Sequence, residues 1–536
     1  MKLNPILLEV FNNRFASISE EMGVCLMRTA YSPNIKERRD FSCALFDPAG
    51  EMVAQAAHIP VHLGSMPMSV KAAVQSGPMA QGDMVILNDP FKGGTHLPDV
   101  TLVAPVFDPQ DPGGGPVFYA ANRAHHADVG GMAPGSMPLS TSLYQEGMII
   151  PPLKLVEKGE IDKKLLGLIL NNVRTPGERE GDFASQIMAN ITGVKRCREL
   201  MDKYGRELCV EYARGLIDHA ERMTRAALEK IPEGRYDFED FLDNDGQDDH
   251  RIPIRLDLCV DRDSVLLDFS RSGDQARGCL NAVGSIAVSA ALYVFRCLIR
   301  ENIPTNGGCL RPITVKTRKG SIVDASFPAA VAGGNVETSQ RIVDVILGAL
   351  SKAMPGLIPA ASQGTMNNIA IGGTDPEHGP FAYYETLAGG MGGSGMGPGE
   401  SAVHSHMTNT LNTPVEAMEY AYPFRVREYS IRKGSGGQGV EPGGDGLVRE
   451  IELLVQAEAT VLSERRETTP YGLGGGETGQ PGKNTLVLNG ESIPMPGKFQ
   501  VTLAKGDRIR IETPGGGGWA GKSKSKAPPD PPSQTF

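Results

Sequence analysis

The chain has little of what marks secreted, membrane and nucleic-acid-binding proteins. Its eight cysteines are scattered without a C-x-x-C pair, and without a signal-peptide pattern they are expected to be reduced thiols. No apolar stretch approaches the ~20 residues of a membrane span. The net charge is −10 and no basic stripe stands out, which argues against nucleic acid or an anionic membrane as a partner. We therefore expect a soluble, cytoplasmic protein.

Standard catalytic signatures are also missing. The sequence has no H-E-x-x-H zinc motif, and its nearest approach to a serine-nucleophile pattern, at 392–396, lacks the strand and helix that such a serine needs. Glycine, in contrast, is abundant, with 65 of 536 residues against an average usage of about 7%. Because glycine permits unusual turns and close backbone approach, its clustering in loops is typical of an enzyme.

The spacing of apolar residues predicts a mixed α+β fold with more than one core. Buried strands are expected on both sides of a polar loop at 88–99, amphipathic helices between 160 and 230, and strands with glycine turns after 421. The predicted parts are a β-rich N-terminal metal-site region (1–155), a helical segment (156–235), a central α/β region (236–420), a β-rich C-terminal region (421–520) and a disordered tail (521–536).

One motif matches a nucleotide-binding signature by its letters alone. Residues 516–523, GGGWAGKS, fit the phosphate-loop pattern G-x-x-x-x-G-K-[ST]. A phosphate loop leads directly into a helix, but only thirteen residues follow Ser523 and four of them are prolines. We interpret the match as a glycine-rich turn that runs into a polar tail, and not as an ATP site.

The densest polar cluster lies between residues 88 and 136. It contains three of the ten histidines together with several aspartates, next to apolar strands: Asp89, His96, Asp99, His125, His126 and Asp128. Imidazole and carboxylate together are the usual ligands of Zn²⁺, Mn²⁺ and Fe²⁺. The other interpretation is that these residues cap turns, since Asp-Pro and Pro-Asp pairs are typical of turns. From spacing alone both interpretations stay open.

Three further polar stretches each allow a functional and a purely structural interpretation. Asp40 precedes an apolar strand within the charged run 37–40, where it is either a ligand or base, or part of a solvated charge run. A glycine turn places Asn335, Glu337, Thr338 and Ser339 at a helix start, which suits either a substrate anion or ordinary capping. The glycine-rich stretch 389–420, with His404 and His406, is either a substrate loop or a mobile one.

Six motifs in order along the chain resemble the B-type subunits of the hydantoinase/5-oxoprolinase family. They are ERRDFSCALFD, NDPFKGGTHLPDVTLVAPVF, RAHHADVGGMAPGSMP, GNVETSQRIVD, NTLNTPVEAMEYAYP and GGQGVEPGGDGLVR, followed by the terminal TPGGGGW. The similarity covers nearly the whole chain and is specific to the family, but not to one substrate.

The resemblance implies an enzyme subunit that works with an A-type ATPase subunit in a hetero-oligomer. The partner holds ATP and Mg²⁺ and phosphorylates a cyclic amide (5-oxoproline, hydantoin or N-methylhydantoin), and the B-type subunit opens the ring with a divalent metal (Zn, Mn or Fe). The implied metal ligands are Asp40, His96 and His125, with His126 as the alternative to His125. Further hypotheses assign Asp99 or Asp128 as proton acceptor and Asn335, Glu337, Thr338 and Ser339 to the substrate carboxylate.

Two other functions remain as alternatives. The first is a subunit of an ATP-dependent ketone carboxylase, in which the activated substrate is joined to a carboxyl group. The second is a non-catalytic subunit that only stabilises its partner.

Overall fold

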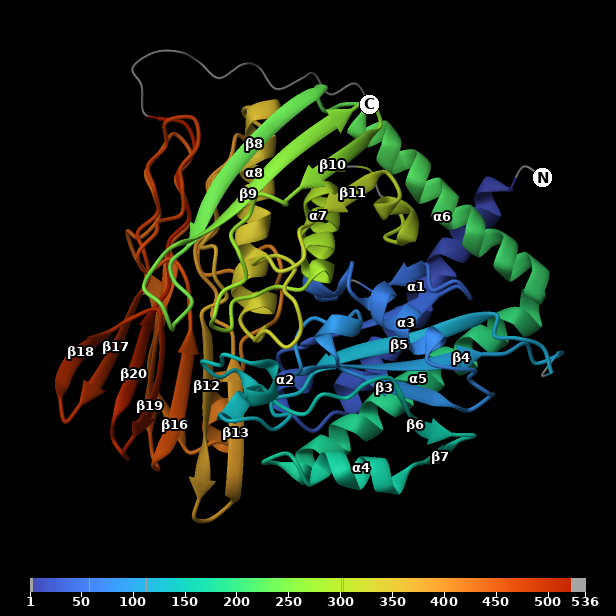
Figure 1. Ribbon diagram of the computed structural model, residues 1–536, viewed down its shortest axis with the longest axis horizontal. Helices are drawn as coiled ribbons and strands as arrows, with labels where there is room; N and C mark the ends of the chain where they lie inside the picture. The colour runs from blue at the N-terminus through green and yellow to red at the C-terminus, as the bar shows by residue number, and fades with distance from the viewer. Residues whose placement is uncertain (1–2, 57, 112, 300, 302, 522–536) are drawn as a thin grey trace.

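The computed structural model describes residues 3–521 except 57, 112, 300 and 302. Helices and strands are mixed along the described part of the chain, and its strands form four separate sheets. This confirms the prediction of an α+β fold. Figure 1 shows the N-terminal sheet and its helices at one side of the molecule and the two C-terminal sheets at the other side. The central sheet and its two helices lie between these two parts. The five predicted domain limits stay predictions, and nearly all of the predicted tail lies outside the described residues.

The N-terminal sheet has seven antiparallel strands in the order β2-β1-β5-β4-β3-β6-β7. Its strands are β1 (Phe41–Phe46), β2 (Met52–Gln55), β3 (Met84–Leu87), β4 (Asp99–Val106), β5 (Phe118–His125), β6 (Leu153–Glu157) and β7 (Glu160–Ile161). Every residue of β4 and β5 is buried. These strands are covered on both faces, and the polar side chains that they carry near the site, such as Asn122 and Arg123, are buried with them.

Helices cover both faces of this sheet. Met66, Val70 and Ala73 of one helix pack on one face, and the long helices that run from 5 to 29 and from 176 to 228 pack on the other. The helices are α1 (Pro5–Thr29), α2 (Pro33–Lys36), α3 (Met66–Gln75), α4 (Lys163–Leu170), α5 (Pro176–Tyr204) and α6 (Arg206–Leu228). No helix in the described part of the chain is both long enough and apolar enough to cross a membrane.

The central unit is a four-stranded sheet, in the order β11-β10-β9-β8, packed on two buried helices. Residues of β9 alternate between buried and half-buried because one face of this sheet packs on α8. A π-helical turn, Gly334–Thr338, leads directly into α8. The elements are β8 (Gly234–Leu242), β9 (Ile252–Asp261), β10 (Ser264–Asp268), β11 (Ile313–Lys316), α7 (Gly284–Leu298) and α8 (Ser339–Ala353).

The C-terminal unit consists of two antiparallel sheets around a shared apolar core. One has the order β13-β12-β16-β19 and the other β14-β15-β20-β17-β18 (Figure 1). The elements are β12 (Asn368–Asp375), β13 (Gly379–Glu385), α9 (Val415–Ala421), β14 (Phe424–Arg432), β15 (Gly446–Leu453), β16 (Ala457–Leu462), β17 (Lys483–Leu488), β18 (Glu491–Met495), β19 (Lys498–Leu503) and β20 (Arg508–Glu512).

The glycine-rich segment that follows β20 is largely buried, and its backbone amides are hydrogen-bonded within the protein. The backbone amides of Gly516, Gly517 and Gly518 donate to Gly444 O, Ala361 O and Glu477 O at 2.8–2.9 Å. The amides of residues 519–521 also donate to backbone carbonyls. A phosphate loop works by offering its amides to phosphate oxygens, and here none of these six is free. The described part of the motif is therefore a packed turn, while Lys522 and Ser523 lie outside the described residues.

Removing residues 522–536 should leave unchanged the ATP-dependent turnover that the family resemblance implies. All six amides that would have to bind phosphate serve the fold, so the lysine and serine that complete the pattern have no phosphate site to join. The measurement is the steady-state rate of the truncated and full-length chains, each with the same partner and ATP. A loss of more than about tenfold in the rate would contradict this interpretation of the motif.

Candidate metal centre

The candidate site lies at the ends of three neighbouring strands of the N-terminal sheet. Asp40 directly precedes β1, His125 ends β5 and Asp99 begins β4. The strand order is β1-β5-β4, and Asp99 pairs with His125 in the β4–β5 register, so the sheet brings these residues together. His96 lies in the turn that enters β4, where its carbonyl accepts from the Asp99 amide at 3.2 Å.

His96, Asp99 and His125 form a fully buried group with the spacing of metal ligands. His96 Nε2 lies 3.2 Å from His125 Nδ1, and Asp99 Oδ1 lies 3.4 Å from His96 Nε2 and 3.3 Å from His125 Nδ1. Ligands about 2.0–2.2 Å from an ion in a tetrahedron are roughly 3.3–3.6 Å apart, so this triangle matches one tetrahedral face. Asp99 Oδ1 makes no hydrogen bond to any described residue. A buried carboxylate oxygen in that position fits a cation.

The surroundings of His96 leave its inner nitrogen unprotonated, as a metal ligand must be. His96 Nδ1 donates to Ala332 O at 3.1 Å, so Nε2 keeps its lone pair. The Val331 and Ala332 amides both donate to Glu146 Oε1, at 2.8 and 3.0 Å. Burial raises the pKa of Glu146 to about 7, and its hydrogen bonds to Ser140 and these amides oppose the rise. Glu146 thus holds the carbonyl that orients His96.

His125 is held by its backbone and by a stacked ring. Its ring lies parallel to that of Tyr384, with centroids 4.5 Å apart and an interplanar angle of 11°. Asn34 Nδ2 donates to His125 O at 2.6 Å. The Arg38 guanidinium lies 5.1 Å from the Tyr384 ring centroid and donates to the Asn34 side chain. One buried arginine therefore supports both contacts that position His125.

Asp40 lies across His125 from Asp99. Its carbonyl accepts from the His125 amide at 3.0 Å, and its carboxylate lies 3.8 Å from Arg38 Nη1. Burial raises the pKa of Asp40, and the charges of His125 and Arg38 oppose the rise. Asp40 is next to the group, but the carboxylate within it belongs to Asp99, which the sequence placed in the polar cluster and which the family resemblance left as a candidate base next to the implied ligands.

Two residues that the sequence did not single out, His62 and Thr95, contact Asp99 of this group. Asp99 Oδ2 lies 3.4 Å from His62 Nε2 and accepts from the Thr95 hydroxyl. Burial alone would raise the pKa of Asp99, but the imidazoles of His96, His62 and His125 hold it well below its ordinary value. The only sequence signal for His62 was its place in the turn-like segment HIPVH, 37 positions from Asp99.

His126 and Asp128 face away from this group. His126 Nε2 contacts Gln186 Oε1 at 2.9 Å, and its ring stacks on Phe183 of α5. Burial lowers the pKa of His126 to about 4. Asp128 accepts from the Arg174 amide at 2.6 Å and from its guanidinium at 2.8 Å. Of the two adjacent histidines the group therefore contains His125, and both carboxylate oxygens of Asp128 are bonded.

Of the four residues at the helix start, one contacts the metal-ligand group. Asn335 Nδ2 lies 3.0 Å from His96 Nε2 and 3.3 Å from Asp99 Oδ2. The other three side chains bind within the protein: Glu337 accepts from the Met366 amide and Asn368, Thr338 donates to Leu280 O, and Ser339 donates to Asn335 O. Burial raises the pKa of Glu337 to about 8, so at neutral pH it is mostly protonated.

Glu337→Gln should stabilise the protein at high pH. Between its ordinary pKa near 4.5 and about 8, folded Glu337 keeps a proton that the unfolded chain has released, so stability falls as pH rises. Glutamine has no proton to lose and still accepts through Oε1. We expect a thermal midpoint within about 1 °C of wild type at pH 5 and a few degrees above it at pH 9. Glu160→Gln, on exposed β7, is the control. Equal midpoints at pH 9 would contradict the prediction.

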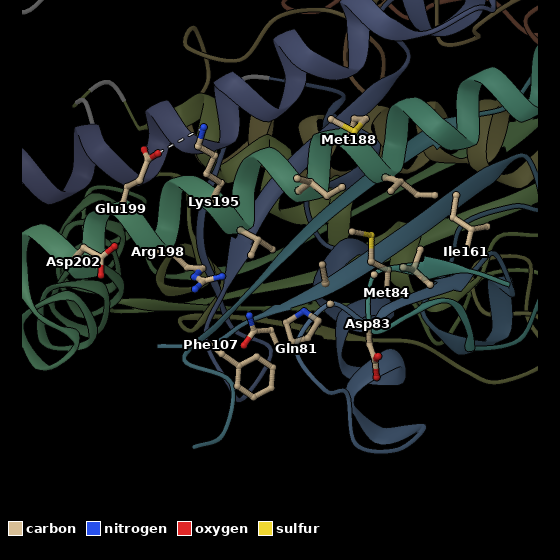
Figure 2. Close-up of a pocket in the computed structure, with 18 residues that line it drawn as sticks. Gln81, Asp83, Met84, Phe107, Ile161, Met188, Lys195, Arg198, Glu199 and Asp202 are labelled. Carbon is tan, nitrogen blue, oxygen red and sulfur yellow. Dashed lines mark ion pairs between the residues drawn. The ribbon is translucent and has the colours of Figure 1, made fainter. Parts of the chain in front are cut away.

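A cavity of about 630 Å³ lies away from these residues, between α5 and the sheet (Figure 2). Its lining is mostly apolar, with Met84, Phe107 and Met188, and it also has charged residues, of which Lys195 and Glu199 are paired at 4.0 Å. It has no histidine, cysteine, serine, threonine or tyrosine among its lining residues. It therefore lacks the pairing of imidazole with carboxylate that marks the candidate metal centre.

The sequence profile described as hydantoinase B/oxoprolinase matches residues 4–522. The chain is 42% identical to a 5-oxoprolinase of Dictyostelium discoideum, over 97% of the chain and 41% of that protein. It is 28% identical to a Pseudomonas sp. (strain NS671) protein provisionally named as the B-type subunit of a D-/L-hydantoinase, over 97% of the chain and 90% of that protein. The chain thus spans less than half the length of the 5-oxoprolinase.

Two solved structures have the same fold. An ATP-dependent caprolactamase from Pseudomonas jessenii superposes with a TM-score of 0.89 at 27% identity, over 97% of this chain and 92% of the other. An acetone carboxylase, solved without nucleotide, superposes with a TM-score of 0.88 at 18% identity, over 96% of this chain and 76% of the other. The second likeness concerns the fold alone.

Proposed function

The chain belongs to the hydantoinase B/oxoprolinase family, and on that premise we propose that it is the metal-bearing B component of an ATP-dependent cyclic-amide hydrolase. The proposed substrates are 5-oxoproline, hydantoin and N-methylhydantoin, each activated by a partner before its ring opens. The observation that supports the proposal is the buried His96–Asp99–His125 group, whose spacing and unbonded carboxylate oxygen fit a divalent cation.

The proposed ligands are His96, Asp99 and His125, with Asp40 as a further predicted ligand across His125. Two imidazoles and carboxylate suit Zn²⁺, Mn²⁺ or Fe²⁺. When bound, such a cation lowers the pKa of water and polarises a carbonyl. Ala332 O fixes the protonated nitrogen of His96, and Tyr384 fixes the plane of His125.

Asn335 is the group that we assign to the substrate. Its Oδ1 is buried without a hydrogen-bond partner among the described residues, while its Nδ2 lies at the edge of the ligand group. Glu337, Thr338 and Ser339 support the turn that carries Asn335, since their side chains bond within the protein. Asp128 is not proposed as proton acceptor because Arg174 occupies both of its oxygens.

We place the ATP chemistry on a separate A-type subunit. The amides of the apparent phosphate loop are used by the fold. The chain covers only 41% of its 5-oxoprolinase relative, so that protein has a large part with no counterpart here. The proposal is therefore a hetero-oligomer in which one subunit activates the amide and this chain completes the reaction.

The test is to co-purify the chain with an A-type subunit and assay ring opening. The panel is 5-oxoproline, hydantoin, N-methylhydantoin and caprolactam, each with and without ATP and bicarbonate. We expect ring opening that requires ATP and whose rate does not change when bicarbonate is added. Turnover only with bicarbonate would establish the carboxylase alternative. Full turnover by the partner alone would establish the non-catalytic alternative.

A further inference from the structure

A chain of hydrogen bonds links the π-helical turn before α8 to the ring that stacks on His125. Glu337 Oε1 accepts from Asn368 Nδ2 at 2.6 Å, and Asn368 Oδ1 accepts from the Tyr384 hydroxyl at 2.7 Å. The Tyr384 ring lies parallel to that of His125, with centroids 4.5 Å apart. All four residues are buried, with at most 3% of their surface exposed. The chain therefore runs from the turn, through one C-terminal sheet, to a proposed metal ligand.

The register of the C-terminal sheet brings the two middle residues of this chain together. Ala370 of β12 pairs with Tyr384 of β13. Asn368 lies two residues before Ala370, so it is the diagonal neighbour of Tyr384 on the same face of the sheet. The strand pairing therefore directs the amide of Asn368 toward the tyrosine hydroxyl.

Each hydrogen bond of the chain has a defined direction. Asn368 Nδ2 donates to Leu462 O at 3.0 Å as well as to Glu337, so both of its protons are used. The oxygen that faces Tyr384 is then Asn368 Oδ1, and the tyrosine hydroxyl must donate to it. A hydroxyl bonded in this way holds the far end of the ring that lies on His125.

The outer nitrogen of His125 has no hydrogen bond that could orient its own ring. His96 is oriented by Ala332 O at 3.1 Å, but His125 Nε2 makes no hydrogen bond to a described residue. A metal-binding imidazole is usually oriented through its second nitrogen. For His125 the Tyr384 ring, at an interplanar angle of 11°, takes the place of that bond. The plane of His125 therefore depends on what holds Tyr384.

The turn that begins the chain is itself fixed in place. Gly334 is packed so closely that an added Cβ would lie 1.9 Å from a backbone carbonyl oxygen. Asn335 and Glu337 lie two positions apart in this turn, so their side chains point in different directions. Asn335 Nδ2 lies 3.0 Å from His96 Nε2, whereas Glu337 contacts Asn368. Turns of this π-helical kind are frequent at functional sites.

We propose that Glu337 is a positioning residue of the metal centre, which fixes the ring plane of His125 through Asn368 and Tyr384 and thereby raises the affinity of the chain for a divalent cation. The proposal rests on the proposed function for the presence of the metal. It gives Glu337 a role besides its support of Asn335, since one turn then serves both histidines of the ligand group.

Glu337 performs this role as an acceptor and needs no charge for it. Burial raises the pKa of Glu337 to about 8, so the carboxyl that accepts from Asn368 is mostly protonated at neutral pH. Glutamine offers the same acceptor oxygen without a charge, and leucine has a similar size without an acceptor. These two substitutions therefore separate the hydrogen bond from the volume of the side chain.

The test measures the Zn²⁺ affinity of the metal-free full-length chain by chelator competition, without ATP, partner or substrate. Glu337→Leu removes the acceptor and Tyr384→Phe removes the hydroxyl but keeps the ring, so each should weaken Zn²⁺ binding about tenfold. Glu337→Gln should stay within about threefold of wild type. Tyr383→Phe is the matched control, because Tyr383 is also buried in β13 but its hydroxyl donates to Glu385. It should leave Zn²⁺ binding unchanged.

A double variant separates positioning from a general loss of stability. Glu337→Leu and Tyr384→Phe interrupt the same chain, so together they should weaken Zn²⁺ binding by the same factor of about ten as either alone. Two independent structural effects would multiply to about 100-fold. Circular dichroism checks that each variant is folded, and Glu337→Ala replaces Glu337→Leu if the latter does not fold. If neither folds, Glu337 serves the fold alone and the proposal fails.

The remaining outcomes also decide the matter. Unchanged Zn²⁺ affinity in folded Glu337→Leu or Tyr384→Phe, a 100-fold loss in the double variant, or an equal loss in Tyr383→Phe would overturn the proposal. A wild-type chain that binds no Zn²⁺ would overturn it together with the proposed function. The expected affinities without any ATP-dependent ring opening would support the positioning role and defeat the proposed function alone.

Discussion

Asp99→Asn is expected to fold, to purify without the proposed divalent metal and to lose nearly all of the proposed ring-opening activity. Asp99 supplies the only carboxylate within the buried triangle, and its Oδ1 has no hydrogen bond to a described residue. Asparagine is neutral and presents an N–H₂ group where an acceptor is needed. Loss of a group that only orients a ligand typically weakens metal binding about 10–100-fold, so loss of a ligand should weaken it by more than about 100-fold.

The measurements are metal content by mass spectrometry, metal affinity by chelator competition, and ATP-dependent turnover with the partner. His126→Gln is the matched control, because His126 is buried next to His125 but contacts Gln186 on the far side of the sheet. It should keep its metal. An Asp99→Asn protein that holds metal at wild-type affinity and lacks turnover would instead assign Asp99 as proton acceptor. One that keeps both would remove Asp99 from the site.

Gly516→Ala should cost the protein more stability than any substitution at an exposed glycine. An added Cβ would lie 1.9 Å from Met391 O and 2.2 Å from Met391 C, both backbone atoms that no rotamer change can move. The adjacent glycines are packed as closely: at Gly517 the distance to Tyr471 O is 2.0 Å. Overpacking typically costs about 1–3 kcal/mol and more where nothing can yield, so we expect a loss above roughly 3 kcal/mol.

Thermal unfolding followed by circular dichroism tests this expectation. We expect the midpoint to fall by at least about 5 °C, or the chain to be insoluble. Gly167→Ala is the control, because a Cβ there meets no atom within 4 Å and the residue lies inside α4. Its midpoint should stay or rise slightly, since alanine favours a helix by up to about 1 kcal/mol. Equal midpoints for both variants would refute the close packing around Gly516.

Local pattern was enough to predict the elements around the site. The apolar runs on either side of the loop 88–99 are β3 and β4, and the periodic stretches between 160 and 230 contain α4, α5 and α6. The glycine-rich turn before residue 522 was also predicted, since the phosphate-loop pattern lacked a following helix. These features depend on neighbours in sequence, and such neighbours determine strand, helix and turn propensity.

The roles of individual side chains depended on contacts that local pattern does not contain. The sequence left Asp99 open as a ligand or a base, because His125 is 26 positions away and only the β4–β5 register places the two residues opposite each other. Ala332, whose carbonyl orients His96, is 236 positions away. Asp128 was a plausible base until its contact with Arg174 was visible. The assignments of Asp40 and of the substrate residues stay predictions.

The contact between α5 and β5 decides which of two adjacent histidines can reach a metal. A shift of β5 by one residue would turn every side chain to the opposite face and exchange His126 for His125. Gln186 prevents this, since it contacts His126 and also donates to Val100 O of β4. Asn122 of β5 donates to the Gln186 carbonyl at 2.8 Å. Which of the two histidines joins the proposed metal group therefore depends on a helix about sixty residues further along the chain, and changes at that helix face should alter the proposed site without touching a ligand.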